Sequence, residues 1–181
     1  EVCSPDMANR EALRELQIRL ASRLQAARTE GLSVSSWLAV EAAGSKYLLP
    51  LGHAGEIFPW TVVQPVPYTQ KWFMGVANLR GGLTGVVDLA GLMGQSHVRT
   101  EQALSEANLL AFNPMLEVNA ALLVDRLAGL RGTDAFVASE PPAEDAPSFF
   151  GSTYIDAEGH RWQELNLQAL SQNNAFLSIS A

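Results

Sequence analysis

The residue types that most often perform chemistry are few and scattered in this chain of 181 residues. Its three histidines, His53, His97 and His160, are dispersed, and we expect surface or loop positions for them rather than a metal site. The only cysteine, Cys3, precedes the first predicted helix in a segment that we expect to be mobile, which makes it a poor nucleophile. A single cysteine also excludes an internal disulfide and suits a reducing compartment.

Motifs for nucleophilic or phosphate chemistry are missing as well. The sequence contains no G-x-S-x-G elbow, no G-x-G-x-x-G turn and no phosphate-binding loop. Three aspartates, Asp88, Asp125 and Asp156, stand where they can cap a helix or close a turn, so they do not predict a carboxylate pair for acid–base catalysis. We therefore expect no catalytic residues, no metal and no cofactor, and we expect that the protein is not an enzyme.

Composition and charge narrow the classes of partner. Hydrophobic residues make up 48% of the chain and charged residues 17%, which is enough to bury a core in one domain or two small ones. Asp and Glu (19) outnumber Lys and Arg (12), which gives a net charge of −7, so binding to nucleic acid is not expected. No stretch approaches the roughly 18 apolar residues of a membrane-spanning helix, so direct insertion into a membrane is not expected.

Binding to another protein is the class of function that these exclusions leave. Arg80 stands at the edge of a glycine turn without an acidic neighbour in sequence, so we expect its guanidinium to be presented to a partner. The rival interpretation is that Arg80 pairs with a distant carboxylate and holds two parts of the fold together. Several aromatic residues in predicted loops are further interface candidates, although most aromatic residues in a domain are core; they are Phe58, Trp60, Tyr68, Trp72, Phe73 and Phe112.

A helix is the clearest local prediction, and we expect it from about Pro5 to Glu30. Ser4-Pro5-Asp6 offers a capping hydroxyl, a proline suited to the first turn and a carboxylate near the positive end, and Gly31 ends the helix. Its apolar residues recur at helical spacing on one face, and we expect this leucine stripe to pack on the rest of the protein; binding of a partner is the alternative. The stripe consists of Leu13, Leu16, Leu20, Leu24 and Ala27.

Short strands separated by glycine turns follow the helix. Hairpins are predicted around Ala43-Gly44-Ser45-Lys46, Arg80-Gly81-Gly82 and Asp156-Ala157-Glu158-Gly159, and a further strand is predicted from Ala120 to Leu123. Many short strands with regular turn signals indicate barrels or a sandwich.

The sequence also contains a weak internal duplication. Each copy has prolines, an aromatic pair near a glycine, a hairpin, and then a short polar residue between apolar ones. The glycines are Gly75 and Gly151, and the polar residues are Asp88 and Asn166, each placed to cap a helix that follows a strand. We therefore expect two similar small β modules, with the acidic, proline-rich stretch 140–147 as a loop inside the second.

The run Gly75-Val76-Ala77-Asn78-Leu79-Arg80-Gly81, followed by Val86-Val87-Asp88-Leu89, resembles a signature of the CheW-like coupling domains of bacterial chemosensory systems. That signature is G-V-x-N-x-R-G, then a strand ending in Asp-Leu. The Pro65-Val66-Pro67 loop, the opening hairpin 37–51 and the strand Leu122-Leu123-Val124-Asp125 fit the same family, so the resemblance covers roughly residues 34 to 180. The leading helix and the layout are similar to the PilI-like couplers of type IV pilus twitching motility.

The resemblance implies a mainly β fold of two packed five-stranded SH3-like barrels with short helices, preceded by an amphipathic helix. Residues 1–32 would be the helical extension, and residues 33–181 the CheW-like domain with its two sub-barrels. It also implies a non-enzymatic cytoplasmic adaptor, recruited to membrane-associated receptor arrays. Its partners would be the cytoplasmic tip of a methyl-accepting chemoreceptor, in the groove between the barrels, and the regulatory domain of a CheA-type histidine kinase, at an end of one barrel.

Carried over residue by residue, the signature predicts a partner-binding site of Gly75, Val76, Asn78, Arg80 and Gly81. The glycines can equally serve shape, through backbone freedom. The leading helix favours a stand-alone adaptor over a detached regulatory domain of a kinase. The alternative from another class is a small-molecule-binding or hydrolytic β-barrel domain, which needs a pocket with convergent polar groups.

Overall fold

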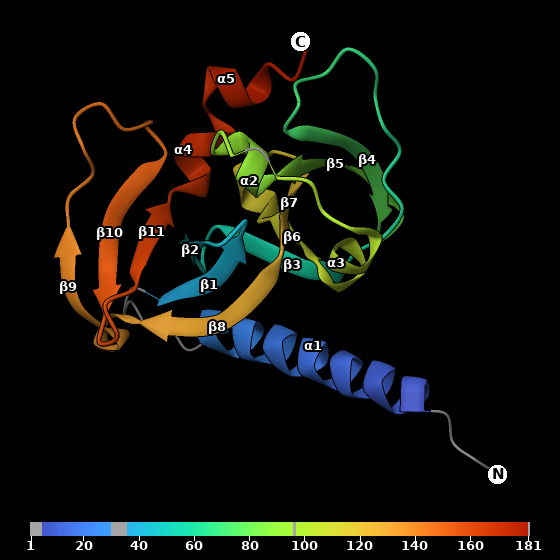
Figure 1. Ribbon diagram of the computed structural model, residues 1–181, viewed down its shortest axis with the longest axis horizontal. Coiled ribbons are helices and arrows are strands. Elements are labelled where there is room, and N and C mark those ends of the chain that lie inside the picture. Colours follow the sequence, from blue (N-terminus) through green and yellow to red (C-terminus); the bar gives the residue numbers. More distant parts are fainter. Residues whose placement is uncertain (1–4, 30–35, 96, 181) are drawn as a thin grey trace. The chain divides into compact units, whose positions relative to one another are not determined.

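The computed structural model describes residues 5–29, 36–95 and 97–180 (Figure 1). Contacts divide the chain into two compact units, Glu1–Ser33 and Val34–Ala181. The first unit contains α1 (Pro5–Thr29), which confirms the predicted helix and begins at the proline suited to a first turn. Its predicted end, Gly31, lies outside the described residues. The two units are described separately, so the packing of the leucine stripe stays a prediction. Among the described residues, no helix is long and apolar enough to cross a membrane.

The second unit is built from two sheets (Figure 1). Within residues 36–95 and 97–180, the first sheet has six strands in the order β8-β1-β2-β11-β10-β9. These strands are β1 (Ser36–Ala42), β2 (Ser45–Pro50), β8 (Arg126–Gly132), β9 (Phe136–Glu140), β10 (Phe150–Asp156) and β11 (Arg161–Leu165). The second sheet has five strands in the order β3-β6-β7-β5-β4. They are β3 (Ala54–Pro59), β4 (Phe73–Leu79), β5 (Gly82–Asp88), β6 (Asn108–Phe112) and β7 (Ala120–Val124).

The two sheets repeat one pattern of neighbours. Along β8-β1-β2-β11-β10 the pairings are antiparallel, antiparallel, parallel and antiparallel. Along β3-β6-β7-β5-β4 they follow the same sequence. The predicted duplication is therefore confirmed, and each sheet contains the expected five strands. The first sheet has a sixth strand, β9, which pairs with β10. At the matching position in the second sheet, beside β4, the described residues form only a single bridge, between Gln64 and Val76.

A short helix follows the corresponding strand in each module. α2 (Leu89–Leu92) comes after β5, and α4 (Leu167–Ser171) comes after β11, as the polar residues at 88 and 166 predicted. The remaining helices connect strands or end the chain; they are α3 (Glu101–Glu106), α5 (Asn174–Leu177) and the 3₁₀ turns η1 (Pro114–Leu116) and η2 (Thr133–Ala135).

The two sheets pack on each other through β1 and β7, which are in contact. β7 is buried along its whole length, as expected for a strand that is covered on both faces. Leu123 lies in the core of its own sheet, and the neighbouring Leu122 points to the opposite face because side chains alternate along a strand. The N–H of Asp125 also donates to the carbonyl of Glu41 at 2.9 Å, which ties the end of β7 to β1.

Candidate interaction surface

The β4–β5 hairpin ends in a two-residue turn at Arg80 and Gly81. Their φ angles are 53° and 76°, and the strands pair up to Leu79 and Gly82, which is the geometry of a type I′ turn. Nothing lies within 4 Å of a Cβ built on Gly81, so this glycine is favoured by its backbone conformation and not by crowding. The sequence prediction of a hairpin at this position is confirmed, and the turn projects the arginine at its tip.

Gly75 is buried, and it is surrounded closely by backbone, unlike Gly81. Its φ is +138°, and a Cβ at this position would lie 2.1 Å from the carbonyl oxygen of Gln64. Gln64 and Val76 exchange backbone hydrogen bonds of 2.8 and 2.9 Å, so the segment before β4 lies directly on the strand. This contact gives Gly75 a structural reason to be glycine; a contact between Gly75 and a partner stays a prediction.

Four of the five predicted site residues lie on one exposed surface. Alternation along β4 places Ala77 and Leu79 in the core, and it places the half-buried Val76 and the exposed Asn78 on the outer face. Leu83 pairs with Asn78 across the hairpin and is 66% exposed. We define the hairpin surface as Val76, Asn78, Arg80, Gly81 and Leu83. It combines an exposed cation, an amide and an aliphatic side chain, which is a composition suited to contact with protein.

Arg80 is exposed, as expected from the sequence, and it also has a carboxylate partner that is distant in the sequence. Its Nη2 lies 2.7 Å from Oε1 of Glu56 on β3, and the two side chains are 75% and 38% exposed. The rival interpretation is right about a distant carboxylate, but both residues belong to the five-stranded sheet, so the pair does not join the two barrels. An exposed ion pair contributes little to stability, about 0–1 kcal/mol, but it orients the guanidinium. Glu56 escaped the sequence analysis because the pairing depends on the arrangement of strands.

The hairpin is held in place by Asn119, which the sequence analysis also missed. The Asn119 side-chain amide donates to the carbonyl of Leu83, and its oxygen accepts from the Thr84 hydroxyl at 3.2 Å. The backbone carbonyl of Asn119 accepts from the N–H of Gly85 at 3.1 Å. These bonds fix the start of β5 to the segment before β7, so the hairpin surface is presented on a rigid base.

The predicted aspartates have two different surroundings. Asp88 stands at the N-cap of α2, but its side chain makes no capping hydrogen bond and faces Arg99, with Asp88 Oδ1 2.9 Å from Nη1. Asp125 also pairs with Arg99, and it accepts from the N–H of Ala43 at 2.6 Å. Burial pushes the pKa of Asp125 upward, but the hydrogen bonds from Arg99 and Ala43 outweigh it, so the pKa lies below its ordinary value.

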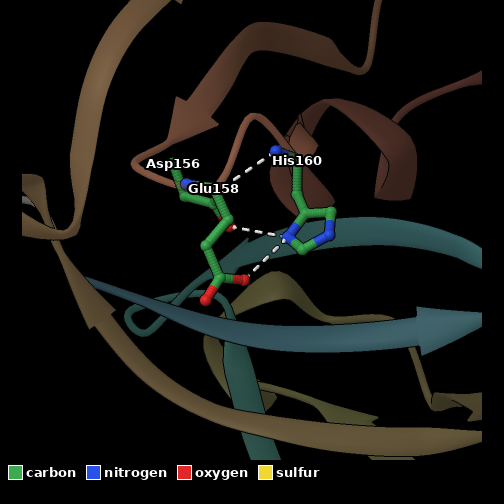
Figure 2. Close-up of side chains that lie close together, drawn as sticks. All are labelled: Asp156, Glu158 and His160. Atoms are coloured by element: carbon green, nitrogen blue, oxygen red, sulfur yellow. Dashed lines mark hydrogen bonds and ion pairs between the residues drawn. The ribbon is translucent and has the colours of Figure 1, made fainter.

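The third aspartate, Asp156, lies in a cluster with Glu158 and His160 at the β10–β11 turn (Figure 2). His160 Nδ1 is 3.3 Å from a carboxylate oxygen of Asp156 and 3.4 Å from one of Glu158. These are metal-ligand types, and the expectation of isolated histidines overlooked that Asp156 stands four residues before His160.

The hydrogen bonds of Asp156 nevertheless identify it as the residue that closes the turn. One oxygen accepts from the backbone N–H of Glu158 at 3.0 Å and of His160 at 2.9 Å, and the other accepts from Trp162 Nε1 at 3.0 Å. The bond from Trp162 is the largest cause that lowers the pKa of Asp156 to about 2. Both oxygens are therefore already engaged by N–H donors.

A depression of about 470 Å³ lies over β2, β10 and β11 and bears on the small-molecule alternative. The basic side chains that line it each lie beside a carboxylate: Lys46 beside Glu41, Arg161 beside Glu140, and His160 beside Asp156. The basic groups in this depression are thus already paired within the protein. The depression therefore does not favour binding of a small anionic ligand.

The candidate aromatic residues divide between core and surface. Phe112 is buried and stacks on Phe176, with ring centroids 5.8 Å apart, and Trp72 also stacks on Phe176 at the same distance. Tyr68, in contrast, is 89% exposed, in the loop between β3 and β4. Of these three residues, only Tyr68 remains a candidate for an interface.

Two related β modules that present an exposed hairpin on a rigid base define an interaction scaffold. The model of the CheW-like domain family matches residues 36–175. Protein PilI of Pseudomonas aeruginosa is 31% identical over 170 residues, which cover 90% of this chain and 89% of PilI. The scaffolding protein TtCheW of Thermoanaerobacter tengcongensis has the same fold, with a TM-score of 0.60 and 17% identity, over 73% of this chain and 88% of TtCheW.

The chain belongs to the CheW-like family and is a coupling adaptor of the chemosensory type. The resemblance to this family and to its PilI-like members, predicted from the sequence signature, is confirmed. The predicted mainly β CheW-like fold is confirmed by the similarity to TtCheW.

Proposed function

We propose that this adaptor couples the cytoplasmic tip of a methyl-accepting chemoreceptor to the regulatory domain of a CheA-type histidine kinase, in the pathway that controls twitching motility. It acts by binding alone, without catalysis, in the cytoplasm at membrane-associated receptor arrays. The observation that carries the proposal is the hairpin surface, which displays Arg80 at the tip of a rigid turn in a chain that matches the CheW-like family.

The chemistry of the hairpin surface suits a protein partner with acidic and apolar groups. Arg80 is held by Glu56 yet remains 75% exposed, so its remaining N–H donors are available to a carboxylate or a carbonyl. The exposed Leu83 supplies apolar contact area next to it. Gly81 has no side chain, which lets a partner's backbone approach the turn closely. Arginine is enriched among the residues that dominate binding energy at interfaces.

We propose that residues 1–32 form an extension and that residues 33–181 form the partner-binding domain. In this arrangement the leucine stripe of α1 packs on the domain, and each buried leucine stabilises the fold by about 1.5–3 kcal/mol. Leu16→Asp is then expected to lower the melting temperature, whereas Ile18→Asp, on the opposite face of the helix, is not. If Leu16→Asp melts like the parent and loses a partner, the stripe is itself an interface.

The proposed function is tested by reversing the charge of Arg80. Arg80→Glu is expected to melt like the parent and to weaken binding to the receptor hairpin or to the kinase regulatory domain by about 2 kcal/mol or more. Arg126→Glu is the matched control, because Arg126 is also 71% exposed and paired with a glutamate, Glu41, at 2.5 Å, but in the other sheet. Pull-down and thermal unfolding are measured on the same preparations. Normal binding of both partners by Arg80→Glu removes the hairpin surface from the site.

A further inference from the structure

We propose that Arg99 is a positioning residue, which holds the two sheets of the domain in one orientation by bridging Asp88 and Asp125. Arg99 lies in the segment between α2 and α3, and its side chain is only 4% exposed. Its Nη1 is 2.9 Å from Asp88 Oδ1, and its Nε pairs with Asp125 Oδ1. One guanidinium therefore binds two carboxylates that are far apart in the sequence.

The two carboxylates belong to different parts of the architecture. Asp88 is the last residue of β5, in the five-stranded sheet. Asp125 lies between β7 and β8, where the chain passes from that sheet into the six-stranded one, and it accepts from the N–H of Ala43 in the β1–β2 turn. The contacts thus run without a gap from β5 through Arg99 and Asp125 to the β1–β2 turn of the other sheet.

A second contact ties the same segment to the six-stranded sheet. The Gln95 side-chain amide donates to the Ser45 hydroxyl at 2.8 Å, at the start of β2. The segment that contains Arg99 therefore touches the β1–β2 hairpin directly at Ser45 and, through Asp125, at Ala43. Arg99 attaches this segment to the last residue of β5 through its pair with Asp88, and the N–H of Gln95 attaches it to α2 by donating to the carbonyl of Ala90 at 2.9 Å.

Energetics favour a positioning role over a purely stabilising one. The hydrophobic attraction across the apolar seam between the sheets is not directional. The charge-assisted hydrogen bond from Arg99 Nε to Asp125 is directional, and the ion pair with Asp88 gives the same guanidinium a second point of contact. Buried ion pairs contribute little net stability because both partners lose hydration, and here Arg99 Nη2 and Asp88 Oδ1 have no hydrogen-bond partner among the described residues. The arrangement is therefore better explained by orientation than by stability.

The consequence for coupling rests on the proposed function. An adaptor that binds a receptor and a kinase with different parts of one domain brings them together in a fixed geometry only if the two sheets keep a fixed angle. Loss of the Arg99 bridge is therefore expected to reduce receptor control of the kinase by about tenfold, and to leave the separate affinity for each partner near that of the parent.

The orientation of the sheets is measured by electron paramagnetic resonance with two spin labels on the full chain. Labels are attached at Leu83→Cys on β5 and Val137→Cys on β9, which are 66% and 71% exposed, in a Cys3→Ser background. Arg99→Lys keeps the charge but supplies one ammonium in place of the planar fork, and it is expected to broaden the distribution of distances between the labels. Asp125→Asn is the second variant if Arg99→Lys does not fold. Arg126→Lys, an exposed arginine with a carboxylate partner, is the matched control and is expected to leave the distribution unchanged.

The outcomes separate the positioning role from the proposed function. A parent-like distance distribution in Arg99→Lys, or in Asp125→Asn where Arg99→Lys does not fold, overturns the positioning role. A broadened distribution with normal receptor control of the kinase overturns the link from orientation to coupling. If the parent protein binds neither the receptor hairpin nor the kinase regulatory domain, the proposed function fails, while the distance measurement still decides the role of Arg99.

Discussion

The two modules share one topology, yet they use the position after the hairpin differently. In the second module, Asn166 caps α4, because its side-chain oxygen accepts from the N–H of Ala169 at 3.0 Å. In the first module, Asp88 occupies the same position before α2 but leaves the helix uncapped and binds Arg99. One equivalent site thus serves local helix stability in one copy and a long-range link in the other. A charged side chain can reach out to a cation, whereas a neutral amide is better satisfied locally.

The hairpin tips diverge in the same way. The first tip is a two-residue turn that exposes the Arg80 guanidinium. At the second tip, residues 156–159, three N–H donors hold the Asp156 carboxylate, two from the backbone and one from Trp162. The first tip therefore leaves its charged group exposed, whereas the charged group of Asp156 at the second tip stabilises the turn itself.

The largest expected difference between the modules concerns the equivalent glycines. Gly75→Ala is expected to lower the free energy of unfolding by about 3 kcal/mol, because its φ is +138° and the new Cβ would meet backbone of Gln64. Gly151→Ala is expected to cost about 1 kcal/mol, because there the new Cβ would meet the flexible end of the Glu164 side chain. Urea unfolding measures both. Equal losses would show that the two glycines are used alike.

The next effect separates the link from the cap. Asp88→Asn is expected to cost about 2 kcal/mol, because Arg99 remains buried with Asp125 as its single charged partner. Asn166→Ala removes an N-cap and is expected to cost about 1 kcal/mol. Chemical denaturation at neutral pH gives both values. A loss for Asn166→Ala that exceeds the loss for Asp88→Asn would contradict this assignment of roles.

A smaller effect is expected in the acid range, at the second tip. The hydrogen bond from Trp162 and those from two backbone N–H groups lower the pKa of Asp156 to about 2, below its ordinary value. Its stabilising contribution is therefore complete above the ordinary value, near pH 4, and is lost as the pH falls through about 2. Asp156→Asn should consequently lose less stability than the parent between these limits. Parallel stability curves for the two proteins would rule out this role of Asp156.

The smallest effect is expected at the first tip. Arg80→Ala should change the free energy of unfolding by less than about 0.5 kcal/mol, because its ion pair with Glu56 is exposed to solvent. Thermal unfolding of Arg80→Ala beside Glu56→Ala checks this expectation. A loss of several degrees in both variants would mean that the pair stabilises the fold.

Local signals allowed much of the fold to be predicted from the sequence. The glycine turns predicted the hairpins, the helical spacing of apolar residues predicted α1, and the signature around Arg80 predicted the family. Strands β3, β6, β8 and β9 were missed, because each pairs with a strand that does not follow or precede it through a tight turn. β9, with four exposed residues, shows no buried alternation at all.

The residues of the candidate surface that are close in the sequence were predicted, and those that are distant in the sequence were missed. Val76, Asn78, Arg80 and Gly81 are close in sequence, so a single hairpin brings them together. Glu56 and Arg99 have no comparable signal, since a charged residue in an ordinary polar context is equally compatible with solvent. Their partners are determined only when the sheets assemble.

The order of strands also determines when each module can form during synthesis on the ribosome. All five strands of the β3-β6-β7-β5-β4 sheet lie within residues 54–124, so this sheet can fold as soon as that segment has emerged. The β1–β2 hairpin is made first but must wait for β11, since Tyr47 pairs with Gln163 near the other end of the chain. Until then its apolar residues lack their final cover, which makes it the part of the nascent chain most exposed to misassociation.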